Sequence, residues 1–590
     1  MLIIYSLILL PAIAGLATLG WSSRVGRRIL LVAIAAIHLL LTAALAWNPP
    51  PLSEHAWLGV DHAGLLMLGL TSVLFFATSI YTAGYLQQEY SRRHHDTAEG
   101  FLFNAQPKAI HIGCMLLFLA AMSGASLSQH FGLYWVCMEA TTLASAPLIY
   151  FHRHHRSLEA TWKYILICSV GIALALLGNF LLAVAASGIG EGHPTLVFSS
   201  LLAHARLLHP VWLKAALLFM LVGYGTKMGL APMHSQLPDA DSEAPPAAAA
   251  LLSGALLNCA FLGIYRIHLL CVANGLGRFS HNLLLSLGLL SIAVAAIFII
   301  RQRDFRRMLA YSSVEHMGIL AVGVGLGGIG VFGAALHAIC HSLTKAALFM
   351  TAGNIYTAFD SKFVADVRGL KRTRPITAVL WLGGFLAITG SPPFATFLSE
   401  FTILKAALDG GFYAIGALYL GLLGLIFIGM VNNVIPMTQG LPAESSTDAE
   451  AQPSHEPLWS VMPAGVLLTL MLLLGLWLPR PLNEMLTSIS DRANSLEATK
   501  TTTTERWPGS HGVANSMLGV TNQLKPLDEG NMAASALVPI RRHKPAASKP
   551  THSWLNVSTT AAMRLPEIDV TETPHFFLPS SFPTPGENTP

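Results

Sequence analysis

The chain has 590 residues, of which 53% are hydrophobic and only 11% charged, with a formal net charge of +4 and a mean hydropathy of +0.56. Soluble domains usually carry about 25% charged residues, so this composition indicates a polytopic membrane protein. The small net charge excludes a basic nucleic-acid surface, and six cysteines without a CxxC pair favour neither a disulfide framework nor a thiolate metal site.

Apolar segments along the chain predict fourteen membrane spans, because about 20 mainly apolar residues are needed to cross a bilayer. The first segment lacks the basic start of a signal peptide, so we expect it to be retained. The spans are expected at 2–20, 29–47, 64–85, 110–128, 131–151, 163–186, 210–231, 248–270, 281–300, 306–327, 330–357, 376–404, 411–435 and 459–479.

Basic residues gather in the loops that follow odd-numbered spans. They are Arg24, Arg27, Arg28, Arg92, Arg93, Arg153, Arg156, Lys163, Arg301, Arg303, Arg306, Arg307, Lys371, Arg372 and Arg374. Cytoplasmic loops are enriched in lysine and arginine, so this alternation predicts that these loops are cytoplasmic and that the N-terminus lies outside.

A lysine stands inside the seventh predicted span, immediately before a break in that span. Lys227 follows an apolar run, and Gly229 and Pro232 then interrupt the helix. A cation near the centre of a bilayer costs roughly 2.5 kcal/mol or more, and a broken membrane helix is tolerated where its backbone faces protein or water. Charge and break together predict a hydrated, ion-handling interior.

A second break, Gly-Ser-Pro-Pro at 390–393, interrupts the twelfth span at the corresponding place. Paired interruptions in two halves are typical of repeat-built transporters, whose sites lie at the breaks. We therefore expect two five-span repeats, at 110–270 and 281–435, after three N-terminal spans in 1–109 and before a last span at 459–480.

The character of the chain changes after the last span. Residues 490–590 are rich in threonine, serine and proline and have no sustained apolar period. Such a composition cannot bury enough apolar surface to offset the ordering of the chain, so we predict a disordered tail.

Glu139 lies midway along the fifth span, in the sequence Met-Glu-Ala-Thr-Thr. One interpretation is a protonated carboxyl that is hydrogen-bonded to Thr141 or Thr142. The interpretation we favour is a carboxylate paired with Lys227, since two charges ~4 Å apart gain on the order of 4 kcal/mol at an effective dielectric near 20. The pKa of each group would then depend on the charge of the other, as a proton switch requires.

Two histidines and a lysine recur every four residues on the eleventh span. His337, His341 and Lys345 therefore share one face of a helix. A haem or metal site is one alternative, although the sequence offers no third ligand or haem motif nearby, and hydrogen-bonded core histidines are another. We favour a proton wire, because imidazole accepts and donates protons near neutral pH.

Further polar residues are candidates for the same path. Glu400 follows the second break and corresponds by symmetry to Lys227; a helix-end carboxyl at an interface is the alternative. His234, Glu315 and His316 are accessory candidates, of which the last two are equally well explained by contacts between neighbouring helices. The sequence contains no cofactor fingerprint and no nucleophile constellation, so we expect neither a bound cofactor nor direct catalysis.

With these residues identified, the chain resembles a known family. The segment Gly-Thr-Lys-Met-Gly-Leu-Ala-Pro-Met-His-Ser-Gln-Leu-Pro-Asp-Ala (225–240) resembles the signature of the antiporter-like, proton-conducting membrane subunits of respiratory complex I and its relatives. The resemblance covers most of 60–430 and includes Met-Glu-Ala-Thr-Thr-Leu and His-Ala-Ile-Cys-His-Ser-Leu-Thr-Lys. Within this superfamily, Trp-Val-Cys-Met-Glu-Ala-Thr-Thr-Leu-Ala-Ser-Ala, Ser-Leu-Glu-Ala-Thr-Trp-Lys-Tyr-Ile and Tyr-Ser-Ser-Val-Glu-His-Met-Gly are most similar to the hydrogenase-4 component F group.

The resemblance implies an all-α polytopic fold of two inverted five-helix repeats with broken helices, in a bacterial inner membrane. It implies partners as well: other membrane subunits and a peripheral hydrogenase arm with nickel–iron and iron–sulfur centres. Glu139 and Lys227 would begin a half-channel, and Glu400 would close the far half-channel. The central hydrophilic axis would be formed by His337, His341 and Lys345.

One position departs from the pattern of complex I. Its subunits usually carry a lysine or histidine on the eighth span, where this chain has Asn258. Asparagine cannot titrate, so a proton would have to cross there through ordered water.

The expected function is a proton-translocating subunit of a hydrogenase-4-like or formate hydrogenlyase-like complex. A complex I subunit and a multisubunit cation/proton antiporter subunit are alternatives that share the motifs. Another is a structural anchor that moves no protons, which Asn258 favours. A haem protein on His337 and His341 would show a Soret band.

Overall fold

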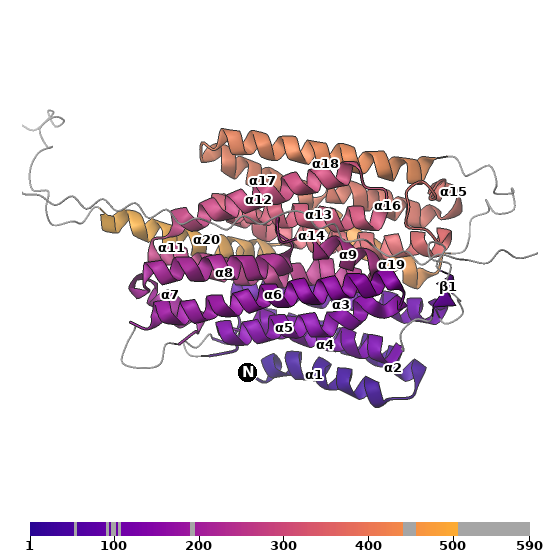
Figure 1. Ribbon diagram of the computed structural model, residues 1–590, viewed down its shortest axis with the longest axis horizontal. Coiled ribbons are helices and arrows are strands. Elements are labelled where there is room, and N and C mark those ends of the chain that lie inside the picture. The colour runs from indigo at the N-terminus through magenta and orange to yellow at the C-terminus, as the bar shows by residue number, and fades with distance from the viewer. Residues whose placement is uncertain are drawn as a thin grey trace, which may run out of the picture. The chain divides into compact units, whose positions relative to one another are not determined.

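The computed structural model describes residues 1–51, 56–89, 94–95, 102–103, 108–188, 195–440 and 456–504 of the chain. These residues form a bundle of helices that run side by side (Figure 1). The helices of the first half are α1 (Leu2–Gly20), α2 (Arg24–Trp47), α3 (His62–Glu89), α4 (Lys108–Leu127), α5 (Phe131–Ile149), η1 (Tyr150–His152), α6 (His155–Ala186), α7 (Phe198–Ala203), η2 (Ala205–Leu207), α8 (Pro210–Met228), α9 (Gln236–Glu243), α10 (Pro246–Leu251), η3 (Leu252–Leu256) and α11 (Leu257–Asn274).

The second half continues the bundle. Its helices are α12 (Gly277–Ile300), α13 (Phe305–Leu326), α14 (Ile329–Phe359), α15 (Leu370–Thr373), α16 (Pro375–Ile388), α17 (Ala395–Asp409), α18 (Tyr413–Gln439), α19 (Leu458–Leu476) and α20 (Arg480–Thr504). A two-stranded antiparallel hairpin pairs β1 (His94–His95) with β2 (Leu102–Phe103), with His94 opposite Phe103.

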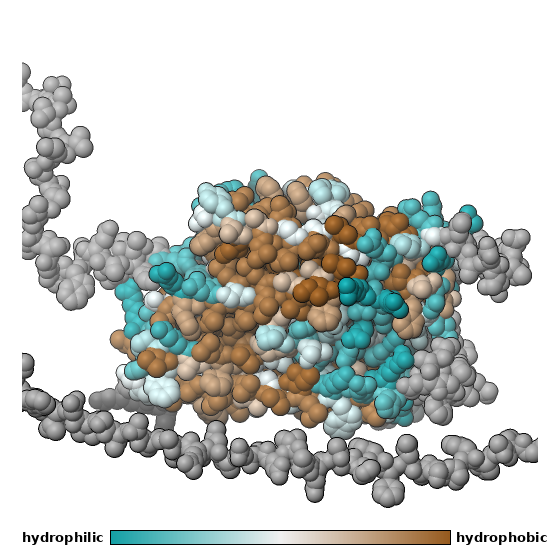
Figure 2. Space-filling model, turned by 45° about the horizontal axis from the view of Figure 1, so that its top comes forward, coloured by the Kyte–Doolittle hydropathy of each residue, from teal (hydrophilic) through white to brown (hydrophobic). Residues whose placement is uncertain are grey.

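Twelve of the described helical segments are long and apolar enough to cross a membrane, which confirms a multi-pass membrane protein. The two other expected spans are built differently. Residues 131–151 correspond to α5, which has 19 residues but is not among the twelve apolar segments. Residues 376–404 are divided between α16, with 14 residues, and α17, with 15 residues, and each of these is shorter than a full span. On the face shown in Figure 2, hydrophobic residues form a band between hydrophilic ends, as contact with lipid requires.

Both predicted breaks are present. Helix α8 ends at Gly229, which has φ +82°, and the chain runs through Pro232 before α9 begins. The second break lies between α16 and α17, where Gly390 has φ +62°. Each break is followed by a short helix, α9 with 8 residues and α17 with 15 residues.

The most buried helices are α10–α11, α13 and α14, whose buried fractions exceed those of the outer helices. Helices α1, α2, α6, α12 and α18 instead expose large apolar side chains, such as Leu166, Val170 and Phe180 of α6. Asn258, His316, His337, His341 and Lys345 therefore lie on central helices that others shield, whereas Glu139, Lys227 and Glu400 lie on the neighbouring helices α5, α8 and α17.

The first residues of the predicted disordered tail are instead helical. Residues 490–504 belong to α20 and are helical, and Ile489, Ser490 and Ala493 are buried against the bundle. The Tyr265 hydroxyl donates to the Ile489 carbonyl at 3.0 Å. Burial of one face of this polar helix explains why a composition rich in serine and threonine is ordered here; residues 505–590 lie outside the described part of the chain.

Candidate functional site

Lys227 lies in the last turn of α8 and is 2% exposed. Its ammonium donates to the Tyr164 hydroxyl at 3.1 Å and to the Thr141 hydroxyl at 3.4 Å, and it lies 5.1 Å from the centre of the Tyr164 ring. The C-terminal end of a helix carries partial negative charge, which also favours a cation. Hydroxyls, a ring face and a helix end therefore surround this buried lysine.

Glu139 and Lys227 are not in direct contact, contrary to the predicted pair at ~4 Å. The Glu139 carboxylate accepts from Ser169 at 3.2 Å and from Thr142 at 3.3 Å. Among the described residues, the Lys227 ammonium donates to hydroxyls and forms no ion pair within 4.0 Å with Glu139. Their charges still interact over a longer distance. Each group instead bonds to hydroxyls near it: Glu139 accepts from Thr142 of its own helix, and Lys227 donates to Thr141 and Tyr164.

A π-helical turn, η3, precedes Asn258 in the eighth predicted span. Its wider turn leaves carbonyls free of the usual helix bonds. The Ser253 carbonyl is 3.0 Å from His341 Nε2, and the Gly254 carbonyl accepts from Ser342 at 2.9 Å. Asn258 donates to Ser342 and, at 3.4 Å, to the Ala338 carbonyl. Asn258 thus holds α11 against α14, while its own side-chain oxygen is buried and has no hydrogen-bond partner among the described residues.

The histidines of α14 form part of a larger cluster. His337 Nε2 lies 2.8 Å from Nδ1 of His316 on α13, and His337 Nδ1 lies 2.9 Å from the Ser399 hydroxyl on α17. The rings of His316 and His341 are 5.2 Å apart. His316, predicted as an accessory, therefore connects His337 to His341.

Lys345 extends the cluster toward α13. It is fully buried and donates to the Leu309 carbonyl and the Ser312 hydroxyl. Its charge interacts with that of Glu315, which is also buried and lies on α13, as Leu309 and Ser312 do. Glu315 thus lies beside the predicted path and not only at a helix contact.

Glu400 completes a group of three residues that could each bind a metal ion. Ligand atoms of His316, His337 and Glu400 all lie within 4.8 Å of one another, on three different helices. The sequence alone offered no third ligand, because these residues are brought together only by helix packing. Imidazole and carboxylate groups at this spacing suit a divalent transition metal, but two of the ring nitrogens already face each other at hydrogen-bond distance.

His234 stands apart from this path. Its ring contacts Phe298 and Tyr311, with ring centres 6.5 and 6.3 Å away. Two hydroxyl residues that the sequence analysis did not single out contact the predicted site: the Tyr164 hydroxyl accepts from Lys227, and the Ser399 hydroxyl lies 2.9 Å from His337 Nδ1. A tyrosine and a serine within apolar spans were the available signal, but both are common there as structural residues.

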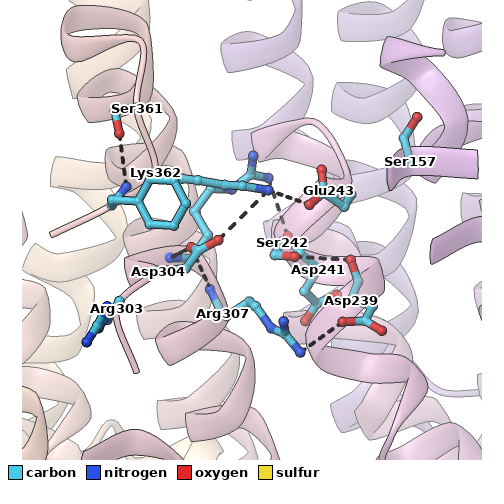
Figure 3. A network of polar contacts seen from close by, with 12 residues as sticks. Ser157, Asp239, Asp241, Ser242, Glu243, Arg303, Asp304, Arg307, Ser361 and Lys362 are labelled. Carbon is cyan, nitrogen blue, oxygen red and sulfur yellow. Dashed lines mark hydrogen bonds and ion pairs between the residues drawn. The ribbon is translucent and has the colours of Figure 1, made fainter. Parts of the chain in front are cut away.

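An ionic cluster lies at the end of the bundle where α9, the start of α13 and the segment after α14 meet (Figure 3). Lys362 pairs with Glu243 and lies 3.9 Å from Asp304, and Arg307 pairs with Asp239 at 3.0 Å. Burial alone would raise the pKa of Glu243, but the Lys362 ammonium holds that pKa below its usual range. The cluster joins the two halves of the chain, since Asp239 and Glu243 follow the first break and Lys362 follows α14.

Comparison with known proteins places these features in a family. The family described as NADH:quinone oxidoreductase/Mrp antiporter, TM matches residues 128–427. A hydrogenase-4 component F homolog from Methylacidiphilum infernorum (isolate V4) is 37% identical over 350 residues, which are 59% of this chain and 72% of the relative. Subunit M of the F(420)H(2) dehydrogenase from Methanosarcina mazei is 32% identical over 50% of this chain and 59% of its own length.

Solved structures share the fold. A chain of the archaeal membrane-bound sulfane sulfur reductase superposes with a TM-score of 0.72 at 20% identity, covering 84% of this chain and 99% of that one. A chain of the Mrp complex from Dietzia sp. DQ12-45-1b gives a TM-score of 0.69 at 20% identity, over 85% and 98% of the two chains. Complex I from Thermus thermophilus contains a similar chain, with a TM-score of 0.68. The chain belongs to the family of antiporter-like transmembrane subunits that complex I and the Mrp antiporters share.

Proposed function

We propose that the chain is the proton-translocating, non-redox membrane subunit of a hydrogenase-4-like or formate hydrogenlyase-like complex. The observation that carries the proposal is the buried series of His341, His316 and His337, which leads to the partly buried Glu400, across three helices. Imidazoles at these separations can pass a proton by accepting it on one nitrogen and releasing it from the other. The 37% identity to a hydrogenase-4 component F homolog favours this type of complex over complex I.

In the proposed mechanism, Lys227 is a switch. A redox-linked change in a partner subunit draws Glu139 toward or away from Lys227, whose present bonds go to hydroxyls. A carboxylate at contact distance favours the charged lysine, and its withdrawal favours proton release. The proton then moves through Lys345, His341, His316 and His337 to Glu400.

Proton flux in the purified complex, reconstituted in liposomes, tests the proposal. We expect Glu139→Gln and Lys227→Ala each to lower redox-driven flux by roughly tenfold or more. Lys214→Ala is the matched control, because Lys214 lies on the same helix, is exposed, and has its ammonium 5.6 Å from the centre of the Phe279 ring. Parent-like flux in both site variants would refute the assignment.

The partners and orientation are part of the proposal. We expect a nickel–iron large subunit and iron–sulfur proteins to co-purify with a tagged chain in mild detergent, and the basic loops to face the cytoplasm with the N-terminus outside. Recovery of NADH-reactive subunits would instead favour complex I. A structural anchor is the second candidate, supported by Asn258, and it predicts intact redox activity with no flux in the parent.

A further inference from the structure

Asp241 on α9 is a buried carboxylate without a protein partner. It is fully buried, and neither carboxylate oxygen accepts a hydrogen bond from any described residue. Its neighbours Asp239 and Glu243 on the same helix both form ion pairs in the ionic cluster described above (Figure 3). An unpaired buried carboxylate is costly, so such a group is normally protonated, hydrated or functional.

The surroundings of Asp241 connect the two parts of the site. Its charge interacts with the Tyr164 phenol of α6, which binds Lys227, and with the ammonium of Lys345 on α14. The Arg306 guanidinium of α13 also interacts with it and donates to its backbone carbonyl at 3.3 Å. Asp241 therefore stands within electrostatic reach of both lysines' surroundings, whereas Asn258, on the route expected from the family, has no proton to exchange.

We propose that Asp241 relays the proton between the Lys227 cluster and Lys345, on a route that bypasses Asn258. The inference rests on the proposed proton-translocating function. In the first step the Lys227 ammonium gives a proton, across intervening water, to the Asp241 carboxylate, which leaves a neutral amine and a neutral acid. In the second step the acid gives the proton to the neutral amine of Lys345, which restores the carboxylate and forms the ammonium.

The electrostatics of Asp241 suit this role. Helix α9 lies between the candidate spans at 210–228 and 246–274, and burial there raises the pKa of Asp241 to about 8, against the opposing charges of Lys345 and Arg306. A relay works best when its pKa lies near the working pH, because it is then present in both protonation states. Helix α10, which also packs against α9, has the sequence Pro-Ala-Ala-Ala-Ala-Leu and adds no titratable group.

The same flux assay, on the assembled complex in liposomes, tests Asp241. Asp241→Asn keeps the shape and removes the titration, so we expect flux to fall by roughly tenfold or more. Asp239→Asn is the control two residues earlier on the same helix, and we expect flux close to that of the parent because Asp239 forms ion pairs in the ionic cluster. Infrared difference spectra add a readout that a structural role would not move: the carbonyl band of a protonated acid, present in the parent and in Asp239→Asn, is expected to disappear in Asp241→Asn.

The outcomes separate the relay from the proposed function. Parent-like flux in Asp241→Asn, with flux lost in Lys227→Ala, overturns the relay and leaves the function standing. Parent-like flux in both overturns the function. If Asp241→Asn does not assemble, Asp241→Glu carries the test: it retains a carboxyl at a new position, so the pH midpoint of flux must move, and an unchanged pH profile overturns the relay.

Discussion

The two broken spans hold opposite charges on opposite sides of their breaks. Lys227 precedes the first break, in the last turn of α8, whereas Glu400 follows the second break, in the second turn of α17. The C-terminal end of a helix is partly negative and the N-terminal end partly positive. A helix end at the break therefore favours a cation in one repeat and a carboxylate in the other. The lysine lies before its break, at a partly negative helix end, and the glutamate lies after its break, near a partly positive helix end.

The neighbours of the two charges differ in a second way. Lys227 is surrounded by the hydroxyls of Tyr164 and Thr141, while Glu400 lies with the imidazoles of His316 and His337. Hydroxyls fix the position of a charge without titrating near neutral pH, whereas imidazoles exchange protons there. We infer that the first break sets the charge state of a lysine and the second break conducts.

The largest effect that would sharpen this contrast is expected at His337. His337→Asn removes the ring between His316 and Ser399 and should lower flux by roughly a hundredfold, because a proton on His316 then has no imidazole at hydrogen-bond distance to accept it. His111→Asn is the control, since His111 is equally buried on α4 but packs on Phe151 outside the path. Flux is measured per assembled complex; similar losses in both variants would mean that buried histidines act here through folding alone.

Alanine substitutions at the two break glycines separate the breaks directly. Gly229 and Gly390 both have positive φ, so each substitution should cost about 1–2 kcal/mol of stability. At Gly229 the added methyl would lie 2.8 Å from the end of the Leu237 side chain, which can move. At Gly390 it would collide with the Glu400 carboxylate. We expect Gly390→Ala to reduce flux several times more than Gly229→Ala at equal loss of thermal stability.

The inverse order would break the comparison between the two repeats. If Gly229→Ala were the more damaging variant at equal stability, the first break would be the conducting element and the placement of Glu400 against Gly390 would be incidental. Proton flux and detergent melting curves, measured on the same preparations, distinguish these results.

Much of the site could be predicted from the chain because charges in apolar spans are rare. Lys227, Glu400 and the stripe of His337, His341 and Lys345 stand out against their surroundings without any structure. The breaks were equally visible, since glycine and proline interrupt helices by their own backbone geometry. The signal was strong where the chemistry of one residue conflicts with a lipid environment.

The remainder depends on how helices pack, which a sequence does not state. His316 lies at hydrogen-bond distance from His337 on the neighbouring helix, and Glu139 and Lys227 bond to different hydroxyls and not to each other. The π-helical turn before Asn258 has no recognisable sequence pattern. Asp241 lies in a polar segment with other carboxylates, so its sequence context does not distinguish it from them. These features follow from contacts between residues far apart in the chain.

The smallest expected effect tests whether the hydroxyls around Lys227 only position it. Tyr164→Phe removes one of its two hydrogen bonds, and a hydrogen bond to a charged group is worth about 1.5–3 kcal/mol, part of which Thr141 retains. We expect flux to fall about two- to fivefold, with a shift in its pH midpoint. Ser145→Ala removes the hydrogen bond between Ser145 and Tyr164 and leaves both hydrogen bonds of Lys227 in place. It should change neither the flux nor its pH midpoint. A loss in Tyr164→Phe as large as that in His337→Asn would mean that the phenol itself passes the proton, so that both repeats conduct and the contrast between a fixed and a relaying half disappears.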